Sequence, residues 1–204
     1  MKKKALLVVI SSPSGAGKTT VCQRILKKNQ EYLYSISYTT RKKRKNEKDG
    51  KDYRFLSFKK FKEKIKRKKL LEWAEVYGNY YGTSKKIVEK AQKEEKVLLL
   101  VLDIQGGIAI KRKYAESVLI FILPPNMKEL ERRLKRRATD KGMELKKRMG
   151  NVFKEVSFLP HYDYVVVNKN LKDTVRIVDQ IIKAEKYKSK RFDFRPAFGR
   201  AKVS

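Results

Sequence analysis

A short segment near the start of the chain has the composition of a phosphate-binding loop. It runs Ser12-Pro13-Ser14-Gly15-Ala16-Gly17-Lys18-Thr19 and matches the pattern G-x-x-x-x-G-K-[ST] everywhere but the first position, where serine replaces glycine. Gly15 and Gly17 let backbone N–H groups turn toward phosphate oxygens, and Lys18 adds a positive charge. An apolar run before the segment and a helical pattern after it disfavour the alternative, an ordinary glycine-containing turn. The segment therefore predicts a binding site for a nucleoside triphosphate, with Thr20 also in the site.

A second group of motifs follows between residues 37 and 83. In chain order these motifs are Thr39-Thr40-Arg41-Lys42-Lys43-Arg44, Glu47, Gly50-Lys51-Asp52-Tyr53, Glu72-Trp73 and Gly78-Asn79-Tyr80-Tyr81-Gly82-Thr83. In this order after a phosphate-binding loop, they resemble guanylate kinase, of the nucleoside monophosphate kinase group, from about Leu7 to about Lys186. The resemblance implies a P-loop kinase that transfers a phosphoryl group from ATP, with Mg²⁺, to GMP and dGMP, giving a nucleoside diphosphate and ADP.

The basic and aromatic residues of these motifs fit an acceptor of that kind. A nucleoside monophosphate is a dianion, which Arg41 and Arg44 could bind through bidentate contacts, assisted by the hydroxyls of Tyr53 and Tyr81. A solvated basic turn is the alternative for the arginines, and ordinary packing on a small sheet is the alternative for the tyrosines. We expect these four side chains to bind the acceptor phosphate.

One acidic residue is suited to recognising the guanine base. Guanine presents N1–H and an exocyclic N2 amine, and a single carboxylate can accept from both; Glu72 is the candidate. The Ser37 and Thr83 hydroxyls would complete the pocket, as the resemblance implies. Adenine would leave the carboxylate unpaired, which should cost on the order of 1–3 kcal/mol or more. We expect the neighbouring Trp73 simply to lie in the core.

Asp103 ends an apolar run, at a position where Walker-B-type carboxylates hold Mg²⁺. The similar family usually has D-I-D-x-Q-G here, whereas this chain has Val101 in place of the first aspartate. Asp103 must therefore be the only carboxylate of this motif that acts toward GMP and the metal, or Glu47 must compensate. The Thr19 hydroxyl is the second candidate ligand for the metal. Capping of the next helix is the alternative role of Asp103.

A third basic cluster, Arg132-Arg133-Leu134-Lys135-Arg136-Arg137, resembles the lid that closes over ATP in nucleoside monophosphate kinases. Family position favours Arg133, Arg137 and Arg148 as catalytic residues beside Lys18 and Arg41, because phosphoryl transfer requires charge neutralisation. A plain basic helix face is the alternative. Asn168 matches a family position near the adenine, although Lys169-Asn170 replaces the usual pair of aspartates after it.

The elements that must position these residues are those of an α/β protein with a parallel sheet flanked by helices. Apolar runs at Ala5–Ile10, Val97–Asp103, Val118–Leu123 and Tyr164–Val167 predict buried strands, and amphipathic patterns lie between them. Short strand-like pieces at Tyr34–Tyr38, Tyr53–Leu56 and Leu71–Val76 predict an inserted, mostly antiparallel lobe.

These patterns divide one domain, residues 1–186, into three parts. The core is expected at residues 5–34, 97–125 and 157–186, the GMP-binding lobe at 35–96 and the helical lid at 126–156. A basic tail, 187–204, lacks periodicity, and we expect it to be frayed.

Composition narrows the remaining classes of function. The formal net charge is +31, but the lysines are spread along the chain, which favours a solvated basic surface over a specific nucleic-acid site. A single cysteine, Cys22, excludes an internal disulfide, and no apolar run is long enough for a membrane span, so we expect a cytoplasmic protein of undetermined oligomeric state. Three alternatives remain. They are a kinase for another acceptor such as a ribose bisphosphate, a non-catalytic guanylate-kinase-like module, and an RNA-binding protein.

Overall fold

The central feature of the fold is a five-stranded parallel sheet. In the computed structural model, which describes residues 2–136 and 143–193, the strands are β2 (Leu6–Ser11), β3 (Leu33–Ser35), β8 (Val97–Val101), β9 (Val118–Leu123) and β10 (Tyr164–Val167). Their order in space is β10-β9-β2-β8-β3, which places the first long strand in the middle. The α/β architecture predicted from the sequence is confirmed, although β8 ends at Val101 and leaves Asp103 beyond it.

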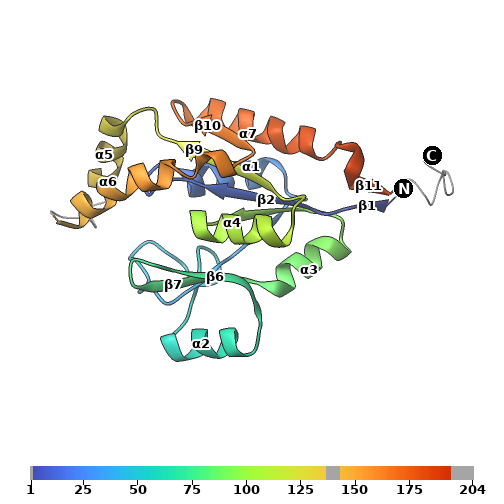
Figure 1. The fold of residues 1–204 in the computed structure, drawn as a ribbon, viewed down its shortest axis with the longest axis horizontal. Helices are drawn as coiled ribbons and strands as arrows, with labels where there is room; N and C mark the ends of the chain where they lie inside the picture. Colours follow the sequence, from blue (N-terminus) through green and yellow to red (C-terminus); the bar gives the residue numbers. More distant parts are fainter. Residues whose placement is uncertain (1, 137–142, 194–204) are drawn as a thin grey trace.

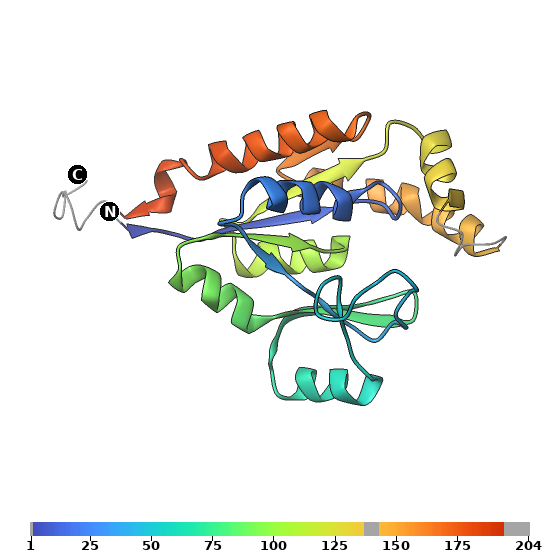
Figure 2. The ribbon, with the colours of Figure 1, turned by 180° about the vertical axis from the view of Figure 1, so that it is seen from behind.

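Helices cover both faces of this sheet, as Figures 1 and 2 show. Side chains of β2 alternate between the faces because successive strand residues point to opposite sides. Leu6, Val8 and Ile10 pack in a cluster with α1 (Lys18–Lys28) and α7 (Leu171–Glu185). Leu7 and Val9 pack in a second cluster with α3 (Lys85–Lys93) and α4 (Ile104–Lys113).

A smaller four-stranded sheet lies below α4 in Figure 1, with α2 (Phe58–Lys66) on its far side. Its order is β5-β4-β7-β6, where the strands are β4 (Tyr38–Thr39), β5 (Arg54–Phe55), β6 (Leu70–Val76) and β7 (Asn79–Ser84). Pairing is antiparallel except between β4 and β5, so the expected lobe is mostly antiparallel. The sheet ends at Ser84, and α3 packs on the central sheet; the lobe boundaries 35–96 stay a prediction.

The expectation that Trp73 lies in the core is wrong. Its side chain is 47% exposed, at the edge of the small sheet, where its ring meets Tyr80 edge-on at 5.5 Å. Phe61 of α2 is fully buried instead and stacks on Tyr80 at 5.5 Å. One short helix therefore covers only the middle of this face and leaves the tryptophan at its margin.

Two further helices, α5 (Met127–Arg136) and α6 (Met143–Val156), stand at the end of the main sheet where its strands finish (Figure 1). They pack on each other through Leu130, Leu134 and Val152. Arg137 lies outside the described residues, and so does the side chain of Arg148, so these two catalytic candidates remain predictions.

The tail expected to be frayed is docked as far as residue 193. A 3-10 helix (Ser189–Arg191) leads into β11 (Phe192–Asp193), which pairs with β1 (Lys2–Lys3). Arg191 is 2% exposed and donates to the carbonyl oxygens of Glu185 at 2.8 Å and Glu116 at 2.6 Å. A buried guanidinium needs such acceptors, and they come from elements that composition alone does not connect to the tail.

Candidate active site

The phosphate-binding loop lies at the carboxyl end of the central strand, where open parallel sheets commonly bind ligands. β2 ends at Ser11, and α1 begins at Lys18 with its N-terminus facing the loop. Gly15 and Gly17 have φ angles of 91° and 101°, in the left-handed region that glycine tolerates. Ser12, in contrast, does not have a positive φ angle. Serine therefore fits the position where the pattern has glycine.

Asn168, at the end of β10, fixes the shape of this loop. Its Nδ2 donates to Ala16 O at 2.8 Å, while Thr174 Oγ1 donates to its Oδ1 at 3.0 Å. A Cβ atom on Gly17 would lie 2.7 Å from that Nδ2 atom, so the loop approaches Asn168 more closely than any side chain at residue 17 allows. The family resemblance implies that Asn168 lies near the adenine, which stays a prediction; in this structure its amide anchors the loop backbone.

Arg133 joins α5 to the same backbone. Its Nη1 donates to Ala16 O at 3.3 Å and its Nη2 donates to Asn168 O at 3.2 Å. Glu129 orients the guanidinium by accepting from Nε at 2.7 Å. The family position favours Arg133 as a catalytic residue, which stays a prediction; in this structure its guanidinium binds the carbonyl oxygens of Ala16 in the loop and of Asn168, which follows β10.

Glu47 organises the basic turn of the lobe. It accepts from Arg41 Nη2 at 2.7 Å and from Arg44 N at 2.8 Å. Burial alone would raise the pKa of Glu47, but these hydrogen bonds lower it overall, and the same contact raises the pKa of Arg41 against the effect of burial. The Arg41 guanidinium also lies 5.4 Å from the Tyr53 ring, which meets Tyr81 edge-on at 5.9 Å. The two arginines and two tyrosines of the expected phosphate site thus lie together, around a carboxylate.

Ser37, Thr83 and Glu72 form a row across three neighbouring strands. Glu72 of β6 pairs with Thr83 of β7, and Ser37 directly precedes Tyr38, which pairs with Gly82. All three side chains are buried, with 6%, 0% and 8% exposure in that order. Glu72 Oε1 and Thr83 Oγ1 have no hydrogen-bond partner in the described part of the chain. Buried polar atoms without partners are rare, and such a row is available to a ligand.

Burial gives Glu72 an unusual affinity for protons. It raises the pKa of this carboxyl to about 7, and the Asp103 carboxylate adds to the effect, while Thr83 and the Lys113 ammonium oppose it. The side chain therefore changes its charge near neutral pH, which matters for any base that it would recognise.

Asp103 caps α4, so the capping role is real. Its Oδ1 accepts from Gly106 N at 2.8 Å, and burial raises its pKa although Gly106 N–H and Lys18 oppose the shift. A Cβ atom on Gly106 would lie 3.0 Å from that Oδ1 and 3.1 Å from Glu72 Oε2. A glycine at this position lets the two carboxyl groups approach the same helix turn.

Comparisons with known proteins decide the family. The family model described as guanylate kinase matches residues 4–185. A guanylate kinase of Carboxydothermus hydrogenoformans is 45% identical over 192 residues, covering 94% of each chain. A guanylate kinase of Clostridium acetobutylicum is 46% identical, covering 91% of this chain and 88% of the relative. The crystal structure of guanylate kinase from Anaplasma phagocytophilum superposes with a TM-score of 0.82 at 33% identity, over 98% of both chains.

The chain belongs to the guanylate kinase family. It is therefore an enzyme, a nucleoside monophosphate kinase with the P-loop kinase fold predicted from its motifs. None of the described helices is long and apolar enough to cross a membrane.

The donor set of this guanylate kinase fold fits a metal ion that is held mainly by substrate. Within the described ranges, no group of three or more His, Cys, Asp or Glu side chains is placed so that it could hold a metal ion. Mg²⁺ usually takes one or two carboxylates and completes its shell with phosphates and water. Asp103 retains an oxygen that the Gly106 cap does not use, and Thr19 is exposed at the start of α1. These two residues fit such an ion without Glu47, which is occupied by Arg41.

Two residues near the site escaped the sequence analysis. Gly106 stands inside the motif used to place Asp103, and its role depends on a close approach that no pattern reveals. Glu155 of α6 is a carboxyl whose pKa burial raises to about 7, with Lys18 opposing and Asp103 reinforcing the shift. Its only sequence signal is a helical position shared with many surface acids.

Proposed function

We propose that this guanylate kinase family enzyme transfers the γ-phosphoryl group of ATP to GMP and dGMP through the residues described above. The observation that carries the proposal is the buried row of Ser37, Thr83 and Glu72, whose polar atoms include two without partners. ATP-dependent phosphorylation of GMP is the activity of the family; the assignment of each residue and the use of dGMP are our own.

On the ATP side, the loop from Ser12 to Thr20 binds the triphosphate. Its backbone N–H groups and the N-terminus of α1 face the anion, and Lys18 supplies charge at the β- and γ-phosphates. Asn168 and Arg133 hold the loop in shape from behind, through Ala16 O. Mg²⁺, held by Thr19 and Asp103, would neutralise charge on the phosphates.

On the acceptor side, Arg41, Arg44, Tyr53 and Tyr81 bind the GMP phosphate. Glu47 holds Arg41 through an ion pair of 2.7 Å with both side chains about one-sixth exposed. A guanidinium that is fixed before substrate arrives loses less entropy on binding, and it presents its remaining N–H groups to the phosphate. Direct in-line transfer between the two phosphates then requires no protein nucleophile.

Base selection follows from the charge on Glu72. The ionised carboxylate accepts from guanine N1–H and N2–H, and this ligand satisfies Oε1. Adenine has neither of these two donors and would leave the buried carboxylate unpaired. None of the three residues in the row is assigned to the sugar, which is why we include dGMP as a substrate.

The proposal is tested by a coupled assay of ADP release with MgATP and, in parallel, GMP, dGMP, AMP, CMP and UMP. We expect turnover with GMP and dGMP to exceed turnover with the other three by at least two orders of magnitude. A site that forms hydrogen bonds to polar groups of its substrate rejects analogues without those groups at least this strongly. Equal rates with AMP would overturn the assignment of the row. A large preference for GMP over dGMP would overturn the claim that the sugar is not read.

A further inference from the structure

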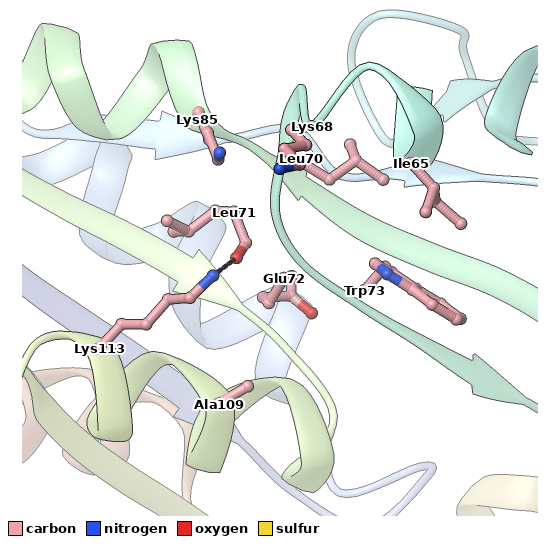
Figure 3. A pocket seen from close by; sticks show the side chains of 9 residues that line it. All are labelled: Ile65, Lys68, Leu70, Leu71, Glu72, Trp73, Lys85, Ala109 and Lys113. Carbon is pink, nitrogen blue, oxygen red and sulfur yellow. Dashed lines mark hydrogen bonds between the residues drawn. The ribbon is translucent and has the colours of Figure 1, made fainter. Parts of the chain in front are cut away.

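A cavity of about 390 Å³ lies beside the free edge of β6, with Glu72 but neither Ser37 nor Thr83 in its lining. Figure 3 shows its nine lining residues, which come from the end of α2 and the turn after it, from β6, from the start of α3 and from α4: Ile65, Lys68, Leu70, Leu71, Glu72, Trp73, Lys85, Ala109 and Lys113. Its volume is within the range of sites that bind small molecules. No role in the reaction described above uses it.

The charged groups of this cavity are mostly cationic. Lys113 Nζ donates to Leu71 O, an edge carbonyl of β6 (Figure 3). No ion pair in the described chain involves Lys68 or Lys85. The backbone holds both lysines in place: Lys68 N donates to Ile65 O at 2.9 Å and Lys85 N donates to Lys69 O at 3.1 Å. Three lysines and one acid, Glu72, therefore line the cavity.

The apolar wall adds an aromatic surface. Trp73 is 47% exposed, although its ring meets Tyr80 edge-on and Phe61, on the same tyrosine, is fully buried. Its ring lies at one end of the cavity in Figure 3, with Ile65 above it and Glu72 beside it. An exposed indole beside lysines is suited to a ligand that combines a flat ring with negative charge.

We propose that this cavity is a regulatory site for a small phosphorylated aromatic compound, whose ring packs on Trp73 and whose phosphate binds Lys68, Lys85 and Lys113. The site is distinct from the nucleotide sites but shares Glu72 with the guanine row. The regulatory part of the inference rests on the proposed function of Glu72.

The shared residue gives the coupling its direction. A phosphate bound near Glu72 disfavours the ionised carboxylate by like-charge repulsion, and the pKa of this group is already raised to about 7. More of the enzyme then carries a neutral Glu72, which accepts less well from guanine. An occupant should therefore raise KM for GMP at neutral pH and leave KM for ATP unchanged.

Binding is measured with phenyl phosphate, using the single tryptophan of the chain as the reporter. Excitation at a wavelength that tyrosine does not absorb reads Trp73 alone, and saturating GMP with ADP keeps both nucleotide sites filled without turnover. We expect a saturable change in fluorescence with phenyl phosphate, at several-fold higher concentration than without GMP because the coupling is reciprocal, and much weaker binding of phenol or inorganic phosphate alone. No saturable change would overturn the site.

The matched variants are Lys68→Gln with Lys85→Gln, and Lys59→Gln with Lys66→Gln on the exposed face of α2. Both pairs remove the same charge from the lobe. The first pair should weaken phenyl phosphate binding at least ten-fold, and the second should change it less than two-fold. Equal weakening by both pairs would show a general charge effect and overturn the site.

Kinetics then test the coupling separately. Phenyl phosphate should raise KM for GMP several-fold in the wild-type enzyme and in the Lys59/Lys66 variant, with no effect in the Lys68/Lys85 variant. Fluorescence binding without any change in KM for GMP would overturn the regulatory role. An enzyme without activity on GMP would instead contradict the proposed function, while the fluorescence titration would still report on the cavity.

Discussion

The two ends of the active site differ in how their polar groups are satisfied before any substrate binds. At the end that we propose binds ATP, Ala16 O accepts from both Asn168 and Arg133, and the Asn168 amide is itself held by Thr174. At the end that we propose binds guanine, Glu72 Oε1 and Thr83 Oγ1 are buried without partners in the described residues. At the first end the protein itself satisfies the polar groups, whereas at the second end a ligand must satisfy them.

This difference corresponds to what each end must recognise. A triphosphate is bound by backbone N–H groups, whose positions must be fixed in advance, so internal hydrogen bonds to the loop improve binding. A base is chosen by donors and acceptors, and an acceptor that only the correct base can satisfy penalises the wrong one. The protein thus uses rigidity at one end and an unsatisfied group at the other.

The largest expected effect is at the ATP end. Lys18→Met should lower kcat by about 10³-fold or more, because the charge that stabilises the transferred phosphoryl group is lost. KM for GMP should change only a few-fold. Steady-state kinetics with each substrate varied would measure both, with Lys27→Met, an exposed lysine of the same helix, as the control. A large rise in KM for GMP would contradict the separation of the two ends.

Glu72→Gln tests the guanine end. The amide presents a donor where the carboxylate had an acceptor, so kcat/KM for GMP should fall by about 10–100-fold and the preference for GMP over AMP should shrink, while ATP binding is retained. Glu75→Gln changes an exposed acid on the same strand and should leave selectivity unaltered. Wild-type selectivity in the Glu72 variant would contradict its role.

Gly17→Ala separates strain from crowding in the loop. Gly50 also has positive φ, 73°, but a Cβ atom there meets nothing within 4 Å. Gly50→Ala should therefore cost about 1–2 kcal/mol of unfolding free energy for the left-handed backbone alone. Gly17→Ala should cost about 1–3 kcal/mol more, because its Cβ would lie 2.7 Å from Asn168 Nδ2. Urea unfolding measures both, and equal losses would show that Asn168 does not constrain the loop.

The smallest expected effect concerns pH. Since the pKa of Glu72 is raised from near 4.5 to about 7, the folded state binds a proton more tightly than the unfolded state. This contribution to stability should fall as pH rises between those values and remain lost above them. Glu72→Gln should then be more stable than wild type at pH 8 by roughly 1–3 kcal/mol, with the difference shrinking toward pH 5.

The same titration should appear in catalysis with the opposite sign. We expect kcat/KM for GMP to rise through about pH 7 as Glu72 ionises, and the Glu72→Gln variant to lose that part of the profile. A variant with an unchanged profile and unchanged stability would show that Glu72 does not titrate in this range.

The features that sequence predicted well are local ones. The P-loop and the strand Val118–Leu123 each depend on residues a few positions apart, and the structure has both. Family motifs also brought Arg41, Arg44, Tyr53 and Tyr81 to one place.

The features that sequence missed depend on distant partners. Trp73 is exposed because it lies on the edge strand β6, a place in the sheet that depends on the pairing of β6 with β7 and of β7 with β4. Arg133 binds Ala16, 117 residues away, and Arg191 binds Glu116, 75 residues away. Charge and hydropathy at these positions suggest a surface, and only the tertiary arrangement shows which carbonyl groups would otherwise be left without donors.

The pairing of β1 with β11 has a consequence for the order of events when the chain is made. The five central strands are complete once Val167 has been synthesised, but Lys2 and Lys3 have no strand partner until residues 192 and 193 follow. The carbonyl oxygen of Glu116 likewise lacks its side-chain donor until Arg191 has been synthesised. Contacts between the first and last parts of a chain close late, since all of the intervening residues must be ordered or looped out. On the ribosome, this kinase would therefore assemble its catalytic sheet first and fasten its two ends together last.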